Sequence, residues 1–251
     1  MLRHRLVTVL TFNDGTLFRT KLFQPDYRYT HNFVDSWQVD EIVMLDVTRN
    51  GGDNRAFLDV VGKFARECFV PLAVGGGIRT LDDVRRFMAV GGDKVVVNTG
   101  AVERPELITE IAEAYGAQCV VVSIDARKTP HGGPGGEYEV FAGCGSKATG
   151  LEPAAWAKRA EGLGAGEILI TSIERDGSLQ GYDLELCKRV SDAVSVPVLV
   201  LGGAGSWKHF VDAIEKAGAS AVCTQNIYHF TESSILSAKK FLADRGIAVR
   251  M

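Results

Sequence analysis

Two glycine clusters have the composition of anion-binding loops. Each follows a short apolar run, one at Gly75–Gly77 and the other at Gly202, Gly203 and Gly205. Glycine lets a backbone approach a ligand closely, and N–H groups at the start of a following helix attract an anion without net charge. Tight turns explain either cluster alone equally well. The pair favours a ligand with two phosphates, because two further apolar runs end in polar residues: Asn98, Thr99, Gln225 and Asn226.

A carboxylate at the end of another apolar run is a candidate acid or base. Asp125 holds this position, and a carboxylate there can move protons on a ligand that lies between the glycine clusters. Acid–base catalysis normally needs a complementary group opposite, where the sequence has Thr11, whose hydroxyl does not titrate in a useful range. Asp14 lies just beyond, but within Asn-Asp-Gly it is better explained as a turn residue.

Charged residues gather at the opposite ends of the apolar runs. Arg5 precedes the first run, and Glu41, Lys94 and Glu167 open three others. Two cations and two carboxylates that point inward can pair in a ring, which avoids the cost of isolated buried charge. From spacing alone, charges turned to solvent are the favoured interpretation.

These residues need elements that bring the ends of the runs together. The apolar, β-rich runs alternate with segments that carry apolar residues at helical spacing and a glycine near the end, such as 81–92. The eight predicted strands are Leu6–Phe12, Glu41–Val47, Val70–Val74, Lys94–Asn98, Cys119–Ile124, Glu167–Ile173, Val196–Leu201 and Ser220–Thr224. This alternation predicts an α/β (β/α)8 TIM barrel with its site at the carboxyl ends of the strands; a doubly wound open sheet is the alternative.

The chain repeats itself at an offset of 126 residues. EIVMLDVTRNG of the second run aligns with EILITSIERDG of the sixth, and the same offset places Gly76 on Gly202. Two (β/α)4 halves explain this pattern, since each half alone would expose two sheet edges. We expect one domain over 1–251, with half barrels at approximately 1–117 and 118–251. The glycine-rich segment 129–139 is expected to form a hairpin or a mobile flap.

The composition describes a globular protein without a bulk electrostatic partner. The 251 residues are 46% hydrophobic and 24% charged, and the net charge of −3 gives no field to hold nucleic acid or an anionic membrane. No apolar run approaches a membrane span, and the opening segment indicates a strand rather than a signal peptide. Five scattered cysteines without a CxxC pair favour reduced, mostly buried thiols in a cytoplasmic protein. No metal and no cofactor is predicted.

The motifs together resemble one family along essentially the whole chain. The order DEIVMLDVT, VGGGI, DKVVVNTGAV, VVVSIDAR, GAGEILITSIERDG, GYD, GGAG and HF resembles the HisF family, the cyclase subunit of imidazole glycerol phosphate synthase. The resemblance implies a (β/α)8 barrel that receives ammonia from a HisH-like glutaminase docked on its amino-terminal face. It also implies that ammonia crosses the barrel interior to an active site on the opposite face.

The resemblance assigns roles to residues already singled out. It implies two phosphate sites, matched by Gly77, Asn98, Thr99, Gly177 and Gly203. It reverses the solvent-facing interpretation of the strand-end charges, because the family's gate at the channel entrance is matched by Arg5, Glu41, Lys94 and Glu167. Asp93 matches the carboxylate that supports coupling to the glutaminase, and Asp125 matches the second of two catalytic aspartates.

The departures from the family pattern lie at the opposite face. Thr11 replaces the first catalytic aspartate, and Arg19 replaces the lysine of the following loop. At the second phosphate site Leu201 stands where serine is usual, and Gln225 and Asn226 replace alanine and serine. Loss of a positioned proton donor or acceptor typically costs about 10²- to 10⁴-fold in rate. These changes argue against cyclase activity.

The changed first loop, 17–33, indicates what replaced that activity. It resembles divergent HisF-like proteins of surface-polysaccharide biosynthesis, which work with a HisH-like glutaminase and a sugar amidotransferase that converts an N-acetyl group into an acetamidino group. Its candidates for docking that third protein or a sugar nucleotide are Arg19, Lys21, Tyr27, Arg28 and Tyr29. A mobile basic lid over a phosphorylated small molecule is the alternative.

The resemblance therefore predicts an ammonia-conducting subunit whose partners are a HisH-like glutaminase and a sugar amidotransferase. A genuine cyclase of histidine biosynthesis, in which Asp125 and Asp14 share the acid–base work, is the first alternative. An isomerase of the HisA type, which shares the duplicated barrel, is the second. Thr11 argues against it as well, because that family also uses a strand-one aspartate, and the gate residues favour HisF.

Overall fold

The computed structural model describes residues 3–13, 16–21, 24–26, 39–48, 54–133, 136–225 and 235–250. Five residues with predicted roles lie outside this described part of the chain: Asp14, Tyr27, Arg28, Tyr29 and Asn226. No helix within it is long and apolar enough to cross a membrane.

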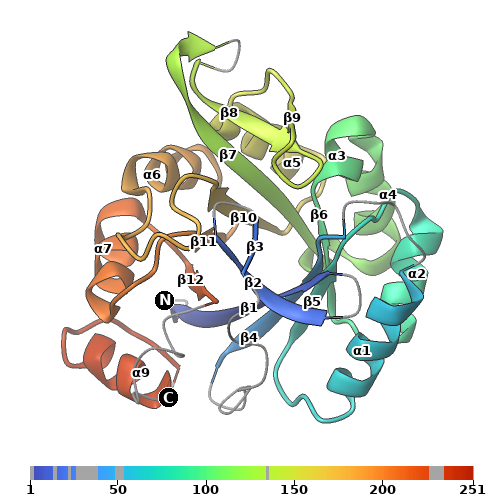
Figure 1. Ribbon diagram of the computed structural model, residues 1–251, viewed down its shortest axis with the longest axis horizontal. Helices are drawn as coiled ribbons and strands as arrows, with labels where there is room; N and C mark the ends of the chain where they lie inside the picture. The colour runs from blue at the N-terminus through green and yellow to red at the C-terminus, as the bar shows by residue number, and fades with distance from the viewer. Residues whose placement is uncertain are drawn as a thin grey trace.

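Parallel strands close into a barrel (Figure 1). In hydrogen-bonded order the eight described barrel strands are β1 (Arg5–Asn13), β4 (Glu41–Asp46), β5 (Leu72–Gly75), β6 (Lys94–Val97), β7 (Val120–Gly133), β10 (Glu167–Ser172), β11 (Val198–Leu201) and β12 (Ala221–Thr224). Strand β12 pairs with β1, so no edge remains among them. The predicted TIM barrel is confirmed, and the open-sheet alternative is wrong. Apart from the end of β7, every strand begins and ends within two residues of its prediction.

Helices follow most strands and cover the outside of the barrel (Figure 1). The described ones are α1 (Arg55–Ala65), α2 (Leu81–Ala89), α3 (Thr99–Glu103), α4 (Glu106–Tyr115), η2 (Ala117–Cys119), α5 (Pro153–Gly162), α6 (Leu184–Ala193), α7 (Trp207–Ala217) and α9 (Ile235–Ala243). Their starts follow local chemistry. The Thr80 hydroxyl accepts the Asp83 N–H while the Asp83 carboxylate accepts the Thr80 N–H, a capping box that fixes the first turn of α2.

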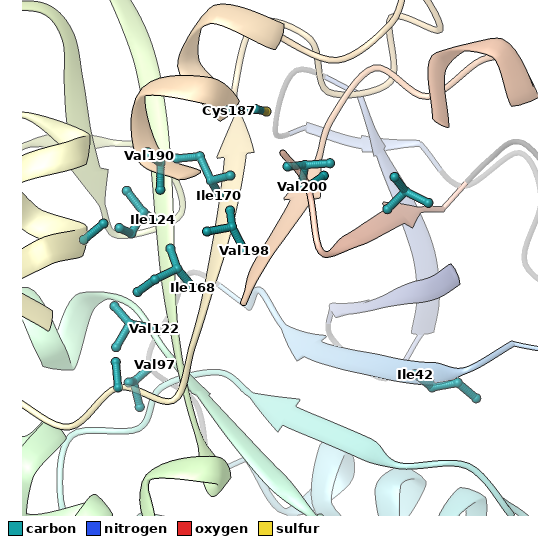
Figure 2. Packing of buried hydrophobic residues seen from close by; sticks show 14 of the residues in the cluster. Ile42, Val97, Val122, Ile124, Ile168, Ile170, Cys187, Val190, Val198 and Val200 are labelled. Atoms are coloured by element: carbon teal, nitrogen blue, oxygen red, sulfur yellow. The ribbon is translucent and has the colours of Figure 1, made fainter. Parts of the chain in front are cut away.

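Strand residues alternate between two apolar regions, because successive side chains of a strand point to opposite faces. Figure 2 shows the outer region, where Ile168 and Ile170 of β10 lie near Val122 and Ile124 of β7 and Val190 of α6. All five side chains are fully buried. Residues of the other face, such as Leu169 of β10 and Val121 of β7, point into the barrel and belong to a second, smaller cluster. The outer region packs helices onto strands, which leaves the interior residues available for a site.

A long hairpin extends from the fifth barrel strand. Strand β7 continues to Gly133 and pairs antiparallel with β8 (Gly136–Ala142), which pairs with β9 (Lys147–Ala148). Figure 1 shows the β7–β8 hairpin projecting beyond the carboxyl ends of the strands. The prediction of a hairpin at 129–139 is confirmed. A second antiparallel extension joins β1 to β2 (Thr16–Lys21), which places Arg19 and Lys21 on a strand, and β2 to β3 (Gln24–Asp26).

A buried ion pair ties the last helix to the amino end of the barrel. Lys239 Nζ of α9 lies 2.8 Å from Asp40 Oδ1, and Asp40 Oδ2 accepts the N–H of Leu6 at 2.8 Å. Lys239 and Asp40 are each 6% exposed. Removing one partner of such a pair leaves an uncompensated buried charge, so the contact fixes α9 against β1.

All five cysteines are free thiols, as expected. Cys187 and Cys223 are buried, whereas Cys68, Cys119 and Cys144 are only half-buried. The expectation of mostly buried thiols is therefore wrong for three of them. Each of those three lies near a strand end or in a turn, where less of the chain covers a side chain.

Candidate functional site

The barrel interior is organised in three layers along the strands. The lowest layer is charged and lies at the amino ends; the middle layer is apolar; the top layer is polar and lies at the carboxyl ends. Strand β6 shows the order through Lys94 and Val96, with Asn98 directly after the strand, each two residues from the next. Strand β10 repeats the order with Glu167, Leu169 and Thr171.

The lowest layer is a closed ring of four side chains, which we call the charge ring: Arg5, Glu41, Lys94 and Glu167. Arg5 Nη1 lies 2.6 Å from Glu41 and 2.9 Å from Glu167. Lys94 Nζ lies 2.9 Å from each of the same two carboxylates. The four side chains are 1–16% exposed. The solvent-facing interpretation that spacing alone favours is therefore wrong, because each charge finds two opposite charges inside the barrel.

Mutual pairing offsets the burial of the charge ring. Burial lowers the pKa of Arg5, but Glu167 and Glu41 raise it by more, so the net pKa lies above the ordinary value. Neutralising one member would leave its partners short of countercharge. The ring therefore closes the bottom of the barrel with side chains that pair with one another.

The middle layer separates the charged end of the barrel interior from the polar end. This apolar layer comprises Val7, Val9, Val43, Ala73, Val96, Val121, Leu169, Leu199, Leu201, Ala221 and Cys223. Each is at most 7% exposed. Burial raises the pKa of the Cys223 thiol well above its usual range, so it stays neutral. An ion crossing this layer would lose its hydration without gaining partners. The free-energy cost of dehydration is far smaller for a small neutral molecule.

The top layer centres on Asp125 at the mouth of the barrel. We call Asn98, Ser123, Asp125 and Thr171 the polar outlet. Asn98 Nδ2 donates to Asp125 Oδ2 at 2.9 Å. Burial raises the pKa of Asp125 to about 7; the nearby Asp176 carboxylate adds to the rise, and hydrogen bonds with Thr171 and Ser123 oppose it. A carboxyl group with this pKa can hold or release a proton near neutral pH.

Asp176 is a site residue that the sequence analysis did not single out. It is 4% exposed, follows β10, and its N–H donates to Ser172 O in a tight turn. Its carboxylate acts on Asp125 and lines the neighbouring pocket. The one sequence feature that could have pointed to Asp176 is the segment SIERDG that contains it. Its Asp-Gly pair is equally typical of an exposed turn.

The first glycine cluster and the start of α3 lie side by side. A Cβ added to Gly100 would lie 2.2 Å from Ile78 O, next to Gly77. Gly77 has φ +67°, and an added Cβ would meet nothing within 4 Å, so packing does not explain this glycine. The hydroxyl of Thr99 accepts the N–H of Gly143 at 2.9 Å. Gly77, Asn98 and Thr99 are thus brought together, with the Gly143 turn beside them.

The second glycine cluster lines one pocket. Its walls are Asp176, Gly177, Leu201, Gly202, Gly203, Ala204, Cys223, Thr224 and Gln225. The pocket therefore unites Gly177, Gly203 and Gln225, which were predicted to share a phosphate site. Close packing also demands glycine here, since a Cβ on Gly203 (φ +103°) would lie 2.1 Å from Gly181 O. Leu201 and the Asp176 carboxylate make this pocket less hospitable to a dianion than the loops alone suggest.

Two further predicted residues sit at opposite ends of the barrel. Asp93 is exposed at the amino end, where its Oδ2 accepts the N–H of Leu72 at 2.8 Å. Thr11 is 3% exposed at the carboxyl end and pairs in register with Leu45 of β4. The described chain contains no group of three or more histidine, cysteine, aspartate or glutamate residues placed to hold a metal ion.

A comparison of the sequence with known families agrees with the fold. The sequence model of the family described as "Histidine biosynthesis protein" matches residues 8–234. That segment contains both glycine clusters, the polar outlet and three of the four charge-ring residues. The chain therefore belongs to the histidine biosynthesis protein family, which covers HisA, HisF and their relatives.

Proposed function

We propose that this chain is a HisF-like subunit that receives ammonia from a HisH-like glutaminase and conducts it to a sugar amidotransferase of surface-polysaccharide biosynthesis. It performs no cyclase chemistry of its own and works in the cytoplasm. The observation that carries the proposal is the order of the three interior layers: charge ring, apolar layer and polar outlet. Ammonia is small and neutral, so it can cross an apolar layer that excludes ions.

The amino-terminal face supports docking of the glutaminase. Asp93 is exposed beside the charge ring, and its hydrogen bond to Leu72 fixes its orientation. Phe69 precedes β5 on this face and is 85% exposed. An aromatic ring this exposed is typical of an interface residue, and aromatic residues contribute strongly to binding energy. A partner seated here would release ammonia directly at the charge ring.

The carboxyl-terminal face supports the loss of cyclase chemistry. Thr11 occupies the strand-one position where HisF proteins carry an aspartate, and its surroundings are buried. Asp125 therefore has no carboxylate partner on that strand. The β7–β8 hairpin stands beside the outlet and offers a surface to a third protein. The choice of a sugar amidotransferase rests on the resemblance of segment 17–33.

Blocking the apolar layer tests conduction. Val96→Phe adds bulk to a side chain that is 4% exposed in this layer. With the glutaminase and the sugar amidotransferase present, we expect transfer of nitrogen from amide-labelled glutamine to fall at least about tenfold. Transfer from ammonium salt should persist, because it does not need the barrel. Equal loss with both nitrogen sources would contradict conduction, and thermal melting would show whether the variant folds.

A direct assay tests the absence of cyclase activity. Purified protein receives the phosphoribosyl substrate of the cyclase together with ammonium salt. We expect no imidazole glycerol phosphate above the background of Asp125→Asn. Substantial formation would overturn the proposal.

A genuine cyclase of histidine biosynthesis is the second candidate. The observation in its favour is Asp125, whose pKa of about 7 suits acid–base work. Under this alternative another group, such as Asp14, would supply the missing partner. Restored histidine prototrophy in a cyclase-deficient strain would support it; failure despite good expression would count against it.

A further inference from the structure

The polar outlet contains a buried acceptor that no described residue satisfies. Asn98 donates through Nδ2 to Asp125, but its Oδ1 is buried and receives no hydrogen bond within the described chain. A buried acceptor that receives no hydrogen bond destabilises the folded chain. Such an atom indicates a missing donor, and its location above the apolar layer indicates where that donor arrives.

The surroundings of this acceptor favour a small cation. Asp125 and Asp176 approach closely enough for Asp176 to raise the pKa of Asp125. Two carboxylates that repel each other are stabilised by a cation close to both. Ser123 and Thr171, which are 7% and 3% exposed, add hydroxyl oxygens beside Asp125. Asn98 Oδ1 and the Asp125 carboxylate both present oxygen acceptors to a bound ion.

We propose that Asn98, Ser123, Asp125 and Thr171 capture channelled ammonia and hold it as an ammonium ion. Ammonium has four N–H donors and no acceptor, which matches a cluster of amide, carboxylate and hydroxyl oxygens. The capture step is a proton transfer: the O–H bond of the Asp125 carboxyl breaks, a fourth N–H bond forms, and an ammonium–carboxylate pair results. No other reactant is needed. The source of the ammonia rests on the proposed function; the ion site does not.

Capture in this form gives the passage a direction. Ammonia crosses the apolar layer as a neutral molecule, but the ammonium ion cannot return through Val7, Val9 and Val96 without losing its partners. Nitrogen would therefore accumulate at the carboxyl-terminal face. The charged groups facing Asp125 that control this step are the Asp176 carboxylate and the bound ammonium itself.

The isolated chain allows a direct test by titration. Carbon-13 NMR of labelled aspartate carboxyls follows Asp125, with the signal assigned by its loss in Asp125→Asn. We compare ammonium chloride with tetramethylammonium chloride at equal ionic strength, because tetramethylammonium has no N–H donor. Ammonium binds only the carboxylate form, so we expect the titration midpoint of Asp125 to fall by about one pH unit in ammonium.

The controls separate the proposal from its alternatives. Asn98→Ala should abolish most of the ammonium effect, whereas Gln180→Ala, an exposed amide outside the outlet, should leave it intact. Equal midpoints in the two salts would overturn the ammonium site and assign the missing donor to water; this comparison needs only the wild-type chain. An equal fall in potassium chloride would also overturn the proposal, because potassium has no N–H group to donate. If ammonium lowers the midpoint but no glutaminase delivers ammonia to the chain, only the proposed function fails. If a glutaminase delivers ammonia but the Asp125 midpoints in the two salts are equal, only this inference fails.

Discussion

Glu41 and Glu167 stand on strands four positions apart around the barrel, and the same two cations bridge them. Arg5 and Lys94 each contact both carboxylates at 2.6–2.9 Å. The negative charge of each carboxylate is therefore shared between the two cations. The charge ring ties together four strands from both halves of the sequence.

Removing one cation should destabilise the barrel. Lys94→Met leaves two buried carboxylates facing Arg5 alone, and we expect the free energy of unfolding in urea to fall by about 3 kcal/mol. Lys158→Met, at an exposed position, is the control and should change it by less than about 0.5 kcal/mol. Adding Glu167→Gln to Lys94→Met should restore part of the loss, because the charges balance again. Strictly additive effects would show that the ring is not coupled.

The pair between Asp40 and Lys239 predicts an equally sharp contrast. Lys239→Met leaves Asp40 buried beneath α9 without a countercharge, and we expect a loss of about 3–5 kcal/mol. The adjacent Lys240 is exposed on the same helix, so Lys240→Met should be nearly neutral. Urea unfolding of the two variants measures the difference. Similar stabilities would contradict the burial of this pair.

The stability of the protein should depend on pH through Asp125. Its pKa is raised to about 7 in the folded chain, whereas an unfolded aspartate titrates near 3.9. The folded state therefore binds one more proton between about pH 4 and pH 7, and the stability of the wild type falls as pH rises through that window. Asp125→Asn lacks this dependence. Its advantage over the wild type should grow by on the order of 3 kcal/mol from pH 4 to pH 8 and then level off; a constant difference would contradict the raised pKa.

Two glycines, one from each glycine cluster, should respond differently to alanine. Gly203→Ala places a Cβ 2.1 Å from Gly181 O, so backbone must move, and we expect a loss of more than about 2 kcal/mol. Gly77→Ala meets no neighbour and pays only for its left-handed backbone, about 1 kcal/mol. Thermal melting of both variants measures the contrast. Equal losses would show that backbone conformation alone demands glycine at Gly203.

The exposed ring of Phe69 should matter only in the complex. Phe69→Ser removes a side chain that is 85% exposed, so the isolated chain should keep its melting temperature. Its affinity for a HisH-like glutaminase should fall about tenfold, as expected for loss of an interface aromatic residue. Calorimetric titration measures both wild type and variant. Unchanged affinity would show that the glutaminase does not dock at Phe69.

Strand positions were predictable because local pattern determines them. Short apolar runs that alternate with segments of helical spacing predicted all eight barrel strands, and the glycine-rich segment 129–139 predicted the hairpin. The residues of the charge ring were identifiable, but their spacing did not give their inward direction, which only the family resemblance indicated. A residue at a strand end can turn either way, and only pairing across the barrel decides between Arg5 inside and Arg5 outside.

Longer-range features left no local signal. The contact between Asp40 and Lys239 joins residues 199 positions apart, and neither position is unusual by itself. Asp176 looked like a turn residue because burial of its carboxylate comes from packing of the neighbouring loops. The pKa of Asp125 likewise depends on Asp176 and on burial, which appear only when the barrel closes.

The layered interior also limits how this barrel can evolve. Along β10, and along β6 with the residue that follows it, the charge ring, apolar layer and polar outlet occupy alternate residues. A single-residue insertion between Lys94 and Asn98 would turn the residues beyond it to the opposite face, sending the outlet side toward the helices and outer-core side chains inward. A substitution at one strand position, such as Thr11, preserves this alternation, and so does a change in the length of a loop. Evolution can therefore replace residues within the strands and lengthen or shorten the loops between them. It cannot change the number of residues between the charge ring and the polar outlet.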